Sequence, residues 1–189
     1  MSNSLEILKV NKLLPDELIR IIDEYVRFKP KTYSELKTTV NIFRFNKKEA
    51  LERYGNMSDW NTSEITDMSD LFYCYGDMDH FNEDLSNWDV SKVKTMACMF
   101  EGCEFFNQSL ENWDVSNVTN MHDMFKGCRS FNQKLNKWNV SKVTDMRGMF
   151  KSCRSFNQKL NKWDVSKVTD MRGMFLGCSS FNQKLNKWN

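Results

Sequence analysis

The chain has 189 residues and a mass of 22.5 kDa, which suits a single domain or a domain with a small extension. Hydrophobic residues make up 40% of the chain, aromatic residues 13% and charged residues 28%, so the composition excludes a disordered or collagen-like protein. No apolar run approaches the ~18 residues of a membrane span, and the N-terminus lacks the pattern of a secretion signal. We therefore expect an intracellular protein.

Charge is distributed unevenly along the chain, although the formal net charge is only +2. Residues 1–59 contain 11 basic and 9 acidic side chains, residues 60–112 contain 2 and 11, and residues 113–189 contain 14 and 5. The net charges of the three segments are therefore +2, −9 and +9. An acidic block followed by a basic block becomes a gradient of surface potential if the chain is laid out linearly in space.

The N-terminal region, residues 1–59, is predicted to be helical and to precede a separate repeat region, residues 60–189. Pro15 suits the first turn of a helix because a proline there loses no helical hydrogen bond. The apolar residues around it follow helical spacing and would form the buried face of an amphipathic helix. They are Leu14, Leu18, Ile21, Ile22 and Tyr25.

Tryptophan recurs at a fixed spacing of 25 residues, at Trp88, Trp113, Trp138, Trp163 and Trp188. Phenylalanine, cysteine and leucine follow the same period, which predicts units stacked on one another. Trp60 opens a variant first copy, 28 residues before Trp88, and we expect the extra residues between Tyr73 and His80 to form a loop. The sequence contains five copies, and a sixth stops after two residues.

The apolar spacing changes within each copy. In the fourth copy, Leu135, Trp138 and Val140 follow the L-x-x-L-x-L spacing typical of leucine-rich repeats, which predicts a short strand. Residues 143–153 then follow the spacing of a helix face. We therefore predict an α/β solenoid of leucine-rich-repeat-like coils, with one short strand and one short helix per 25 residues, behind a helical N-terminal region.

The repeat itself resembles a known family. Residues 141–165, S-x-V-T-D-M-x-x-M-F-x-x-C-x-x-F-N-Q-x-L-x-x-W-x-V, closely resemble the repeat of the BspA-like leucine-rich repeat surface proteins, also found as the Mycoplasma lipoprotein repeat. The resemblance covers residues 60–189 and implies a solenoid that binds other proteins and is not an enzyme. Residues 45–60 look like the helical leader of protist and giant-virus members, which implies a cap on the first coil. If the chain is viral, its expected location is the host cytoplasm or the virus particle.

A second, shorter resemblance lies in residues 14–25, L-P-D-E-L-I-R-I-I-D-E-Y, which are similar to the opening of an F-box, L-P-x-E-L-x-x-x-I-x-x-Y. F-box proteins join a Skp-type adaptor to a substrate-binding repeat domain, so the resemblance implies a substrate adaptor of a ubiquitin ligase. It assigns binding of the Skp-type adaptor to Leu14, Pro15, Leu18 and Ile22. The alternative is the plain amphipathic helix described above.

The candidate partner-binding surface lies in the predicted strand row. If tryptophan and valine point inward, the residues beside them point outward on the strand face, where leucine-rich-repeat proteins usually bind ligands. The predicted contact residues are Asn87, Asp89, Asn112, Asp114, Lys137, Asn139, Lys162 and Asp164. The function that follows is a non-enzymatic scaffold for protein–protein interaction. The alternative is a structural component of a virus particle or a cell surface.

The cysteines and histidines do not predict a metal or catalytic site. Four cysteines recur every 25 residues rather than in C-x-x-C pairs, which predicts a buried ladder of reduced thiols. They are Cys103, Cys128, Cys153 and Cys178, whereas Cys74 and Cys98 lie outside the ladder. The histidines are His80 and His122, and no sequence feature near them supplies the orienting group that a catalytic Cys–His pair needs. We expect no catalytic, cofactor or metal site.

Two further features concern surfaces and ends. Lysines stack in register at Lys134, Lys159 and Lys184, where we expect a solvated face. We do not expect nucleic-acid binding, because the pI is only ≈ 8.2 and the aromatic residues are assigned to the core.

Repeat arrays need a polar end, yet the last apolar layer here is left uncovered, so we expect self-association through that end or docking into a larger assembly.

The asparagine of the F-N-Q motif recurs in every copy, as in Asn107 and Asn132. Buried polar atoms need hydrogen-bond partners, so we expect these amides to satisfy backbone groups from one coil to the next.

Overall fold

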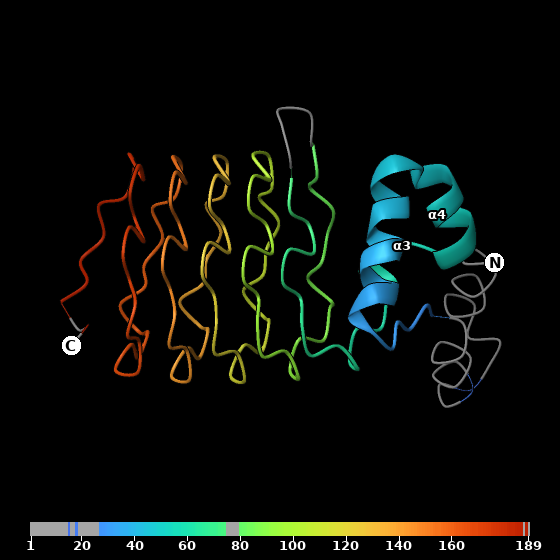
Figure 1. The fold of residues 1–189 in the computed structure, drawn as a ribbon, viewed down its shortest axis with the longest axis horizontal. Helices are drawn as coiled ribbons and strands as arrows, with labels where there is room; N and C mark the ends of the chain where they lie inside the picture. Colours follow the sequence, from blue (N-terminus) through green and yellow to red (C-terminus); the bar gives the residue numbers. More distant parts are fainter. Residues whose placement is uncertain (1–14, 16–17, 19–26, 75–79, 187, 189) are drawn as a thin grey trace.

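The computed structural model describes residues 15, 18, 27–74, 80–186 and 188. It contains helix α3 (Tyr33–Phe45), helix α4 (Lys47–Tyr54) and a short 3-10 helix, η1 (Met57–Asp59). A stack of coils follows, and the two helices lie at one end of it (Figure 1). None of the helices in the described part of the chain is long and apolar enough to cross a membrane.

Both α-helices begin at a polar cap. The side chain of Thr32 accepts a hydrogen bond from the N–H of Glu35 at 3.2 Å, and the side chain of Asn46 accepts one from the N–H of Glu49 at 3.3 Å. Each bond satisfies an N–H that has no partner within the helix. One face of α3 is buried, and its residues are Leu36, Thr39, Val40 and Phe43.

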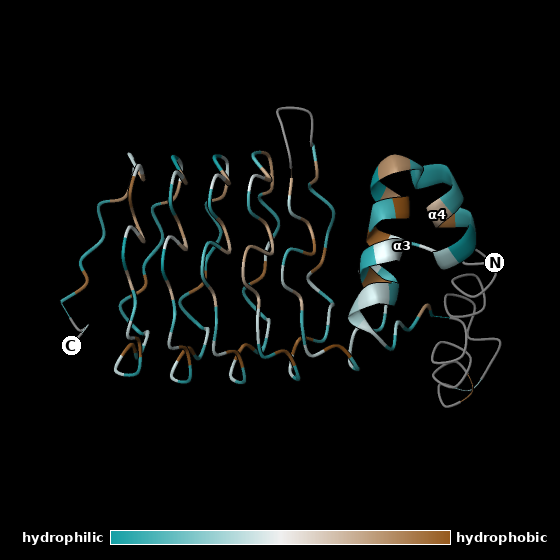
Figure 2. Ribbon diagram, viewed as in Figure 1, coloured by the Kyte–Doolittle hydropathy of each residue, from teal (hydrophilic) through white to brown (hydrophobic). Residues whose placement is uncertain are grey.

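We number the coils from their tryptophans. Coil 1 comprises residues 60–87, coil 2 residues 88–112, coil 3 residues 113–137, coil 4 residues 138–162 and coil 5 residues 163–186. Figure 2 shows that apolar and polar stretches alternate along each coil. Most of the apolar side chains of the five coils are buried together in one core cluster. Residues 75–79, within the predicted loop of coil 1, lie outside the described residues.

The predicted α/β solenoid is wrong. The described residues of the coils contain neither a helix nor a named strand. Neighbouring coils are joined instead by isolated parallel bridges, one residue per coil, at Asp67, Thr95, Asn120, Asp145 and Asp170. Residues 138–140, predicted to be a strand, have no regular secondary structure. The predicted strand face is therefore not the surface of a sheet.

The predicted helix over residues 143–153 is a series of turns, because successive N–H groups have different kinds of partner. Those of Met149 and Lys151 donate to carbonyls three residues earlier in the same coil, at 3.2 and 2.8 Å. Those of Gly148 and Phe150 donate to carbonyls of coil 5, at 3.0 and 2.9 Å. An α-helix needs every one of these groups to bond within its own segment.

Left-handed backbone also interrupts any helix in this part of each coil. The residues of one row have φ between 51° and 65°, and we call them the left-handed row: Asp70, Cys98, Asp123, Gly148 and Gly173. A second left-handed residue follows four positions later in coils 2 to 5, at Gly102, Gly127, Ser152 and Gly177. Left-handed backbone costs a non-glycine residue roughly 1–2 kcal/mol, which explains why glycine is frequent in both rows.

Identical apolar side chains stack on one another through the interior. The ring centroids of Phe100 and Phe125 lie 5.5 Å apart, with ring planes within 1° of parallel. Those of Trp138 and Trp163 lie 6.4 Å apart with parallel planes. The prediction that tryptophan lies above tryptophan is confirmed. We call the first set the inner phenylalanine row: Phe72, Phe100, Phe125, Phe150 and Phe175.

Polar ladders hold the coils in register. The indole N–H of Trp138 donates to the carbonyl of Leu110, 28 residues earlier, at 2.9 Å. The equivalent bond to a leucine carbonyl forms at Trp113, Trp163 and Trp188. The Oδ1 atom of Asn107 accepts the N–H of Asn132 at 2.9 Å, and this bond recurs along the F-N-Q asparagines. The predicted role of these asparagines is confirmed.

Helix α3 caps coil 1. In the later coils, backbone carbonyls accept hydrogen bonds from N–H groups of the coil before. For example, the carbonyl of Ala97 in coil 2 accepts the N–H of Asp70 in coil 1 at 2.8 Å. Coil 1 has no coil before it, and side chains of α3 supply the donors instead. The bonds join Tyr33 Oη to the carbonyl of Ser69 (2.8 Å), Lys37 Nζ to that of Leu71 (3.0 Å) and Arg44 Nη1 to that of Tyr73 (3.1 Å).

Candidate functional site

The eight residues of the predicted partner-binding surface are all exposed, in two rows along the stack. One row consists of Asn87, Asn112, Lys137 and Lys162. The other, which we call the Asx row, consists of Asp89, Asp114, Asn139 and Asp164. The structure thus places them side by side on successive coils although the backbone there is not a strand. Their role in partner binding stays a prediction.

The Asx row also has a structural role that the sequence analysis missed. The Oδ1 atom of Asp114 accepts the N–H of Ser116 at 3.0 Å, and the same bond forms in each coil of the row. Hydrogen bonds from Ser116 hold the pKa of Asp114 below its usual value. Aspartate or asparagine two residues before a backbone N–H is the signature of an Asx turn, so the spacing D-V-S or N-V-S could have predicted this role.

A basic hollow lies on coils 3 to 5. One cavity of about 430 Å³ is lined by four lysines, by one carboxylate and by amide side chains. The lysines are Lys134, Lys137, Lys159 and Lys162, and the carboxylate is that of Glu111. A neighbouring cavity of about 460 Å³ shares Lys159 with it and adds Lys184. We call the five lysines together the lysine groove. Two of them, Lys137 and Lys162, belong to the predicted contact residues.

Charge in the lysine groove is only partly compensated. Lys137 forms an ion pair with Glu111 at 3.4 Å. The other four lysines form no ion pair with any side chain in the described part of the chain. Like charges on neighbouring coils repel one another, and this repulsion is screened by salt. An anionic ligand would therefore be stabilised in the groove.

Two of the four predicted adaptor-binding residues lie among the described residues. Leu14 and Ile22 lie outside the described residues. Pro15 and Leu18 are exposed, and the leucine side chain has 45% of its surface accessible. An exposed leucine is available for contact with another protein, but nothing in the fold assigns it to one.

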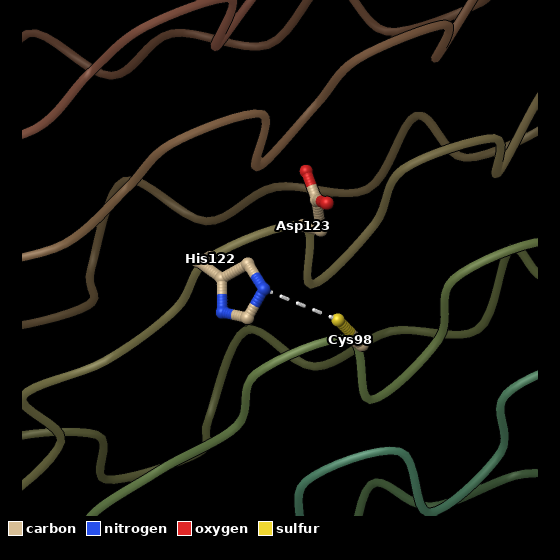
Figure 3. Close-up of side chains that lie close together, drawn as sticks. All are labelled: Cys98, His122 and Asp123. Carbon is tan, nitrogen blue, oxygen red and sulfur yellow. Dashed lines mark hydrogen bonds between the residues drawn. The ribbon is translucent and has the colours of Figure 1, made fainter.

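Three potential metal ligands meet between coils 2 and 3, where the sequence analysis expected none. The Sγ atom of Cys98 and the Nε2 atom of His122 lie 3.5 Å apart. Asp123 lies near them, with its carboxylate directed away from the thiol (Figure 3). One ligand atom from each residue lies within 4.8 Å of the other two. All three side chains are half-buried, so solvent reaches the cluster.

The surroundings of this cluster are acidic. Burial, a hydrogen bond with Glu101 and the negative charges of Glu101, Asp70 and Asp123 raise the pKa of Cys98 to about 12. The thiol is therefore protonated at neutral pH and is a poor nucleophile. Lys126 contacts Glu101 at 2.7 Å and Asp123 at 3.3 Å, and it partly balances these charges. Such an arrangement favours cation binding over nucleophilic catalysis.

The other cysteines are buried. Each ladder cysteine donates its thiol to a phenylalanine carbonyl of the previous coil, as Cys128 does to Phe100 at 3.0 Å. Their predicted burial is confirmed. Cys74 lies next to the ladder, with its Sγ atom 2.9 Å from that of Cys103. The hydrogen bond with Cys103, together with nearby Arg44 and Lys37, lowers the pKa of Cys74.

The sequence contains a feature from which the Cys98 cluster could have been predicted. Cys98 lies outside the cysteine ladder, and His122 and Asp123 stand where the following coils have Arg147 and Gly148. Departures from the repeat in two neighbouring coils meet in space because residues 25 positions apart are stacked. The predicted helix placed these side chains on a regular apolar segment and concealed the proximity.

The stacked 25-residue coils, with their rows of identical side chains and a helical end, define a repeat protein whose sites are built from the outward positions of successive units. The family described as "Mycoplasma protein of unknown function, DUF285" matches residues 37–142 and 105–189, and the chain belongs to this family. The family is related to the BspA-like repeat proteins, so the resemblance noted in the sequence is confirmed at that level. No curated protein and no solved structure matches the chain.

Proposed function

We propose that the protein is a non-enzymatic scaffold for protein–protein interaction, and that it binds an acidic segment of a partner protein in the lysine groove, where the predicted contact residues Lys137 and Lys162 lie. The observation that carries the proposal is the groove itself. Four of its lysines have no ion pair among the described residues, and they line a hollow large enough for side chains of a partner.

The repeat architecture supports an extended ligand. The positive charges recur once per coil along the stack, at Lys134, Lys159 and Lys184, so a chain that runs across the coils would meet one ammonium group after another. Asn157 and Gln158 lie in the same hollow and carry amide groups that can hydrogen-bond a peptide backbone. The aromatic side chains of these coils lie in the core, which favours a protein ligand over a single-stranded nucleic acid.

The test compares two charge reversals of equal size. The variant with Lys159→Glu and Lys162→Glu alters the groove, whereas the control with Lys142→Glu and Lys167→Glu alters exposed lysines that do not line it. Binding of a fluorescent polyglutamate peptide is measured at rising salt concentration. The groove variant should lose most of the binding and most of the salt dependence, and the control should retain both.

Equal losses in the two variants would show that binding follows net charge alone and would overturn the proposal. Affinity purification of the wild type and both variants from source cells, followed by mass spectrometry, then identifies the natural partner. A genuine partner should be recovered with the wild type and the control, and it should be depleted with the groove variant.

A second candidate function, a ubiquitin-ligase substrate adaptor, is favoured by the L-P-D-E-L sequence at residues 14–18 and by the exposed side chain of Leu18. Under this hypothesis the N-terminal region binds a Skp-type adaptor and the coils bind the substrate. Capture of a Skp-type adaptor should be lost on Leu14→Ala and Pro15→Ala substitution and kept in the groove variant. Capture that is insensitive to the first pair would contradict it.

The structural alternative, a component of a virus particle or cell surface in a protist or giant-virus lineage, predicts stoichiometric recovery in purified particles. Self-association is a related prediction. The side chains of Phe175 and Phe181 in coil 5 and of Trp188 after it are only partly buried. Sedimentation velocity at increasing concentration should detect a dimer if a second copy covers this face, and the dimer should weaken on Phe181→Ser substitution.

A further inference from the structure

Three side chains that depart from the repeat converge at one place. In the left-handed row and the position before it, coils 4 and 5 carry the same pair, arginine and glycine. Coils 2 and 3 instead carry Ala97 with Cys98, and His122 with Asp123. The result is a thiol, an imidazole and a carboxylate whose ligand atoms lie within 4.8 Å of one another, in a chain with only two histidines (Figure 3).

We propose that Cys98, His122 and Asp123 form a binding site for a divalent transition-metal ion, with Zn²⁺ as the ion that the ligands fit best. The sulfur and the imidazole nitrogen are 3.5 Å apart, which is close to the separation of two ligands of one tetrahedral ion with bond lengths of roughly 2.0–2.3 Å. Three protein ligands leave a fourth position for water or for a group from another molecule.

The chemistry of the donors selects the class of metal. Thiolate and imidazole are ligands for zinc, cobalt, nickel and copper, whereas calcium and magnesium prefer oxygen ligands throughout. A mixed sulfur, nitrogen and oxygen set with an open position is typical of exchangeable or catalytic zinc sites rather than closed structural ones. On binding, the Cys98 thiol loses its proton to solvent and the sulfur forms the bond to the metal, so that Zn²⁺ and the thiol give a zinc thiolate and one proton.

The backbone holds the ligands in place before any ion binds. The N–H of Cys98 donates to the carbonyl of His122 at 2.9 Å, which joins the two coils within the site itself. The N–H of His122 donates to the side chain of Asn120 at 2.9 Å. Cys98 and Asp123 both have left-handed backbone that costs free energy for a non-glycine residue. The stacked coils therefore fix the backbone that carries these three residues before any ion binds.

The close approach of Asp123 to Gly148 in coil 4 is a second feature of this region. A Cβ atom at Gly148 would lie 1.9 Å from Oδ1 of Asp123, so the carboxylate can occupy its position only because coil 4 has glycine there. At Gly173, the same position in coil 5, a Cβ atom would meet nothing closer than 3.9 Å. The glycine beneath Asp123 thus accommodates the carboxylate next to Cys98 and His122.

The electrostatic field around the cluster favours a cation. The carboxylates of Glu101, Asp70 and Asp123 act on Cys98, and Lys126 contacts two of them from one side. A divalent ion held by the thiolate and Asp123 would offset the repulsion among these acidic groups. None of the three ligands lines the lysine groove, so this inference does not depend on the proposed function.

The experiment titrates the reduced full-length protein with Co²⁺, which takes the place of Zn²⁺ and reports its ligands by absorption. A thiolate ligand gives a charge-transfer band in the near ultraviolet, and tetrahedral coordination gives visible bands. We expect one equivalent of Co²⁺ to produce both sets of bands and one equivalent of Zn²⁺ to remove them. The single-site variants replace each ligand by the residue that coils 4 and 5 carry at its position: Cys98→Gly, His122→Arg and Asp123→Gly.

Cys98→Gly should abolish the charge-transfer band. His122→Arg and Asp123→Gly should weaken Zn²⁺ binding about 100-fold or more, because loss of even an outer-shell partner costs roughly 10–100-fold in affinity. The matched controls, Cys178→Ala and His80→Asn, remove a thiol and an imidazole elsewhere and should bind as the wild type does. Circular dichroism of every variant checks that the stack is intact.

Two results would overturn the proposal. One is a wild-type protein that shows no saturable Co²⁺ band at one equivalent. The other is a band that persists in folded Cys98→Gly protein or disappears in the controls, since either would place the metal on other side chains.

Discussion

The inner phenylalanine row and the left-handed row pass through the same coils and follow opposite patterns. In the inner row, Phe100, Phe125 and Phe150 are fully buried and occupy equivalent places without change. In the left-handed row the residue changes from aspartate to cysteine, back to aspartate and then to glycine. The inner row is constrained because each ring packs on the identical ring of the next coil. In the left-handed row every residue except Gly148 is partly or fully exposed.

This difference shows where a repeat protein can place a site. A change in an inner row disturbs two interfaces at once, so function has to be built on outward positions whose backbone is already fixed by the stack. Both candidate sites follow this rule. The Cys98 cluster lies on coils 2 and 3, where the acidic part of the chain meets the basic part, and the lysine groove lies on coils 3 to 5, in the basic part.

The largest expected effect is in the inner row. Phe125→Ala should lower the free energy of unfolding by roughly 3–5 kcal/mol, because it leaves a cavity between coils 2 and 4. Phe175→Ala, in the same row of coil 5, should cost less, because that ring is only partly buried. Urea denaturation with linear extrapolation measures both. Equal losses would mean that burial by neighbouring coils does not set the contribution of a ring.

A smaller effect is expected at two glycines of the left-handed row. Gly173→Ala should cost roughly 1–2 kcal/mol, because alanine is strained at a φ of 65°. Gly148→Ala should cost more, because the added Cβ atom also meets the carboxylate of Asp123. Thermal unfolding of the two variants gives the comparison.

A double-mutant cycle isolates the second contribution at Gly148. In an Asp123→Gly background, Gly148→Ala should cost no more than Gly173→Ala does in the wild type, since the carboxylate is gone. If the cost at Gly148 does not fall in that background, the close approach to Asp123 is not its cause.

The smallest effect concerns the Asx row, where an outward residue has a structural role. Asp114→Ala should destabilise the protein by roughly 0.5–1.5 kcal/mol, because the N–H of Ser116 loses its acceptor. Asp114→Asn should be nearly neutral at pH 7, because Asn139 already makes this bond in coil 4. Chemical denaturation at constant pH measures both changes.

The same position predicts a dependence on pH. The folded state lowers the pKa of Asp114, so its contribution to stability is complete above the unfolded pKa of about 3.9 and is lost as the pH falls through the lower folded value. Asp114→Asn should remove this part of the acid destabilisation. An unchanged pH profile in the Asp114→Asn protein would show that the aspartate is not responsible.

The sequence analysis was right where one row could be considered by itself. The period of 25 was enough to predict that Trp138 lies over Trp163, that ladder cysteines such as Cys128 are buried and that Asn107 bonds to the next coil. It was wrong about the strand and the helix of each coil, because apolar spacing does not report hydrogen-bond partners. It missed the Cys98 cluster because a contact between residues 24 or 25 positions apart depends on the register of two coils.

The sequence by itself determined the period, the identity of the inward side chains and the separation of acidic from basic coils, because all three are properties of order along the chain. The tertiary structure alone decided that alternate N–H groups bond to the next coil, and this choice replaces helix by turns. It also decided that Cys98 lies beside His122, because stacking converts a repeat distance along the chain into a side-chain contact in space.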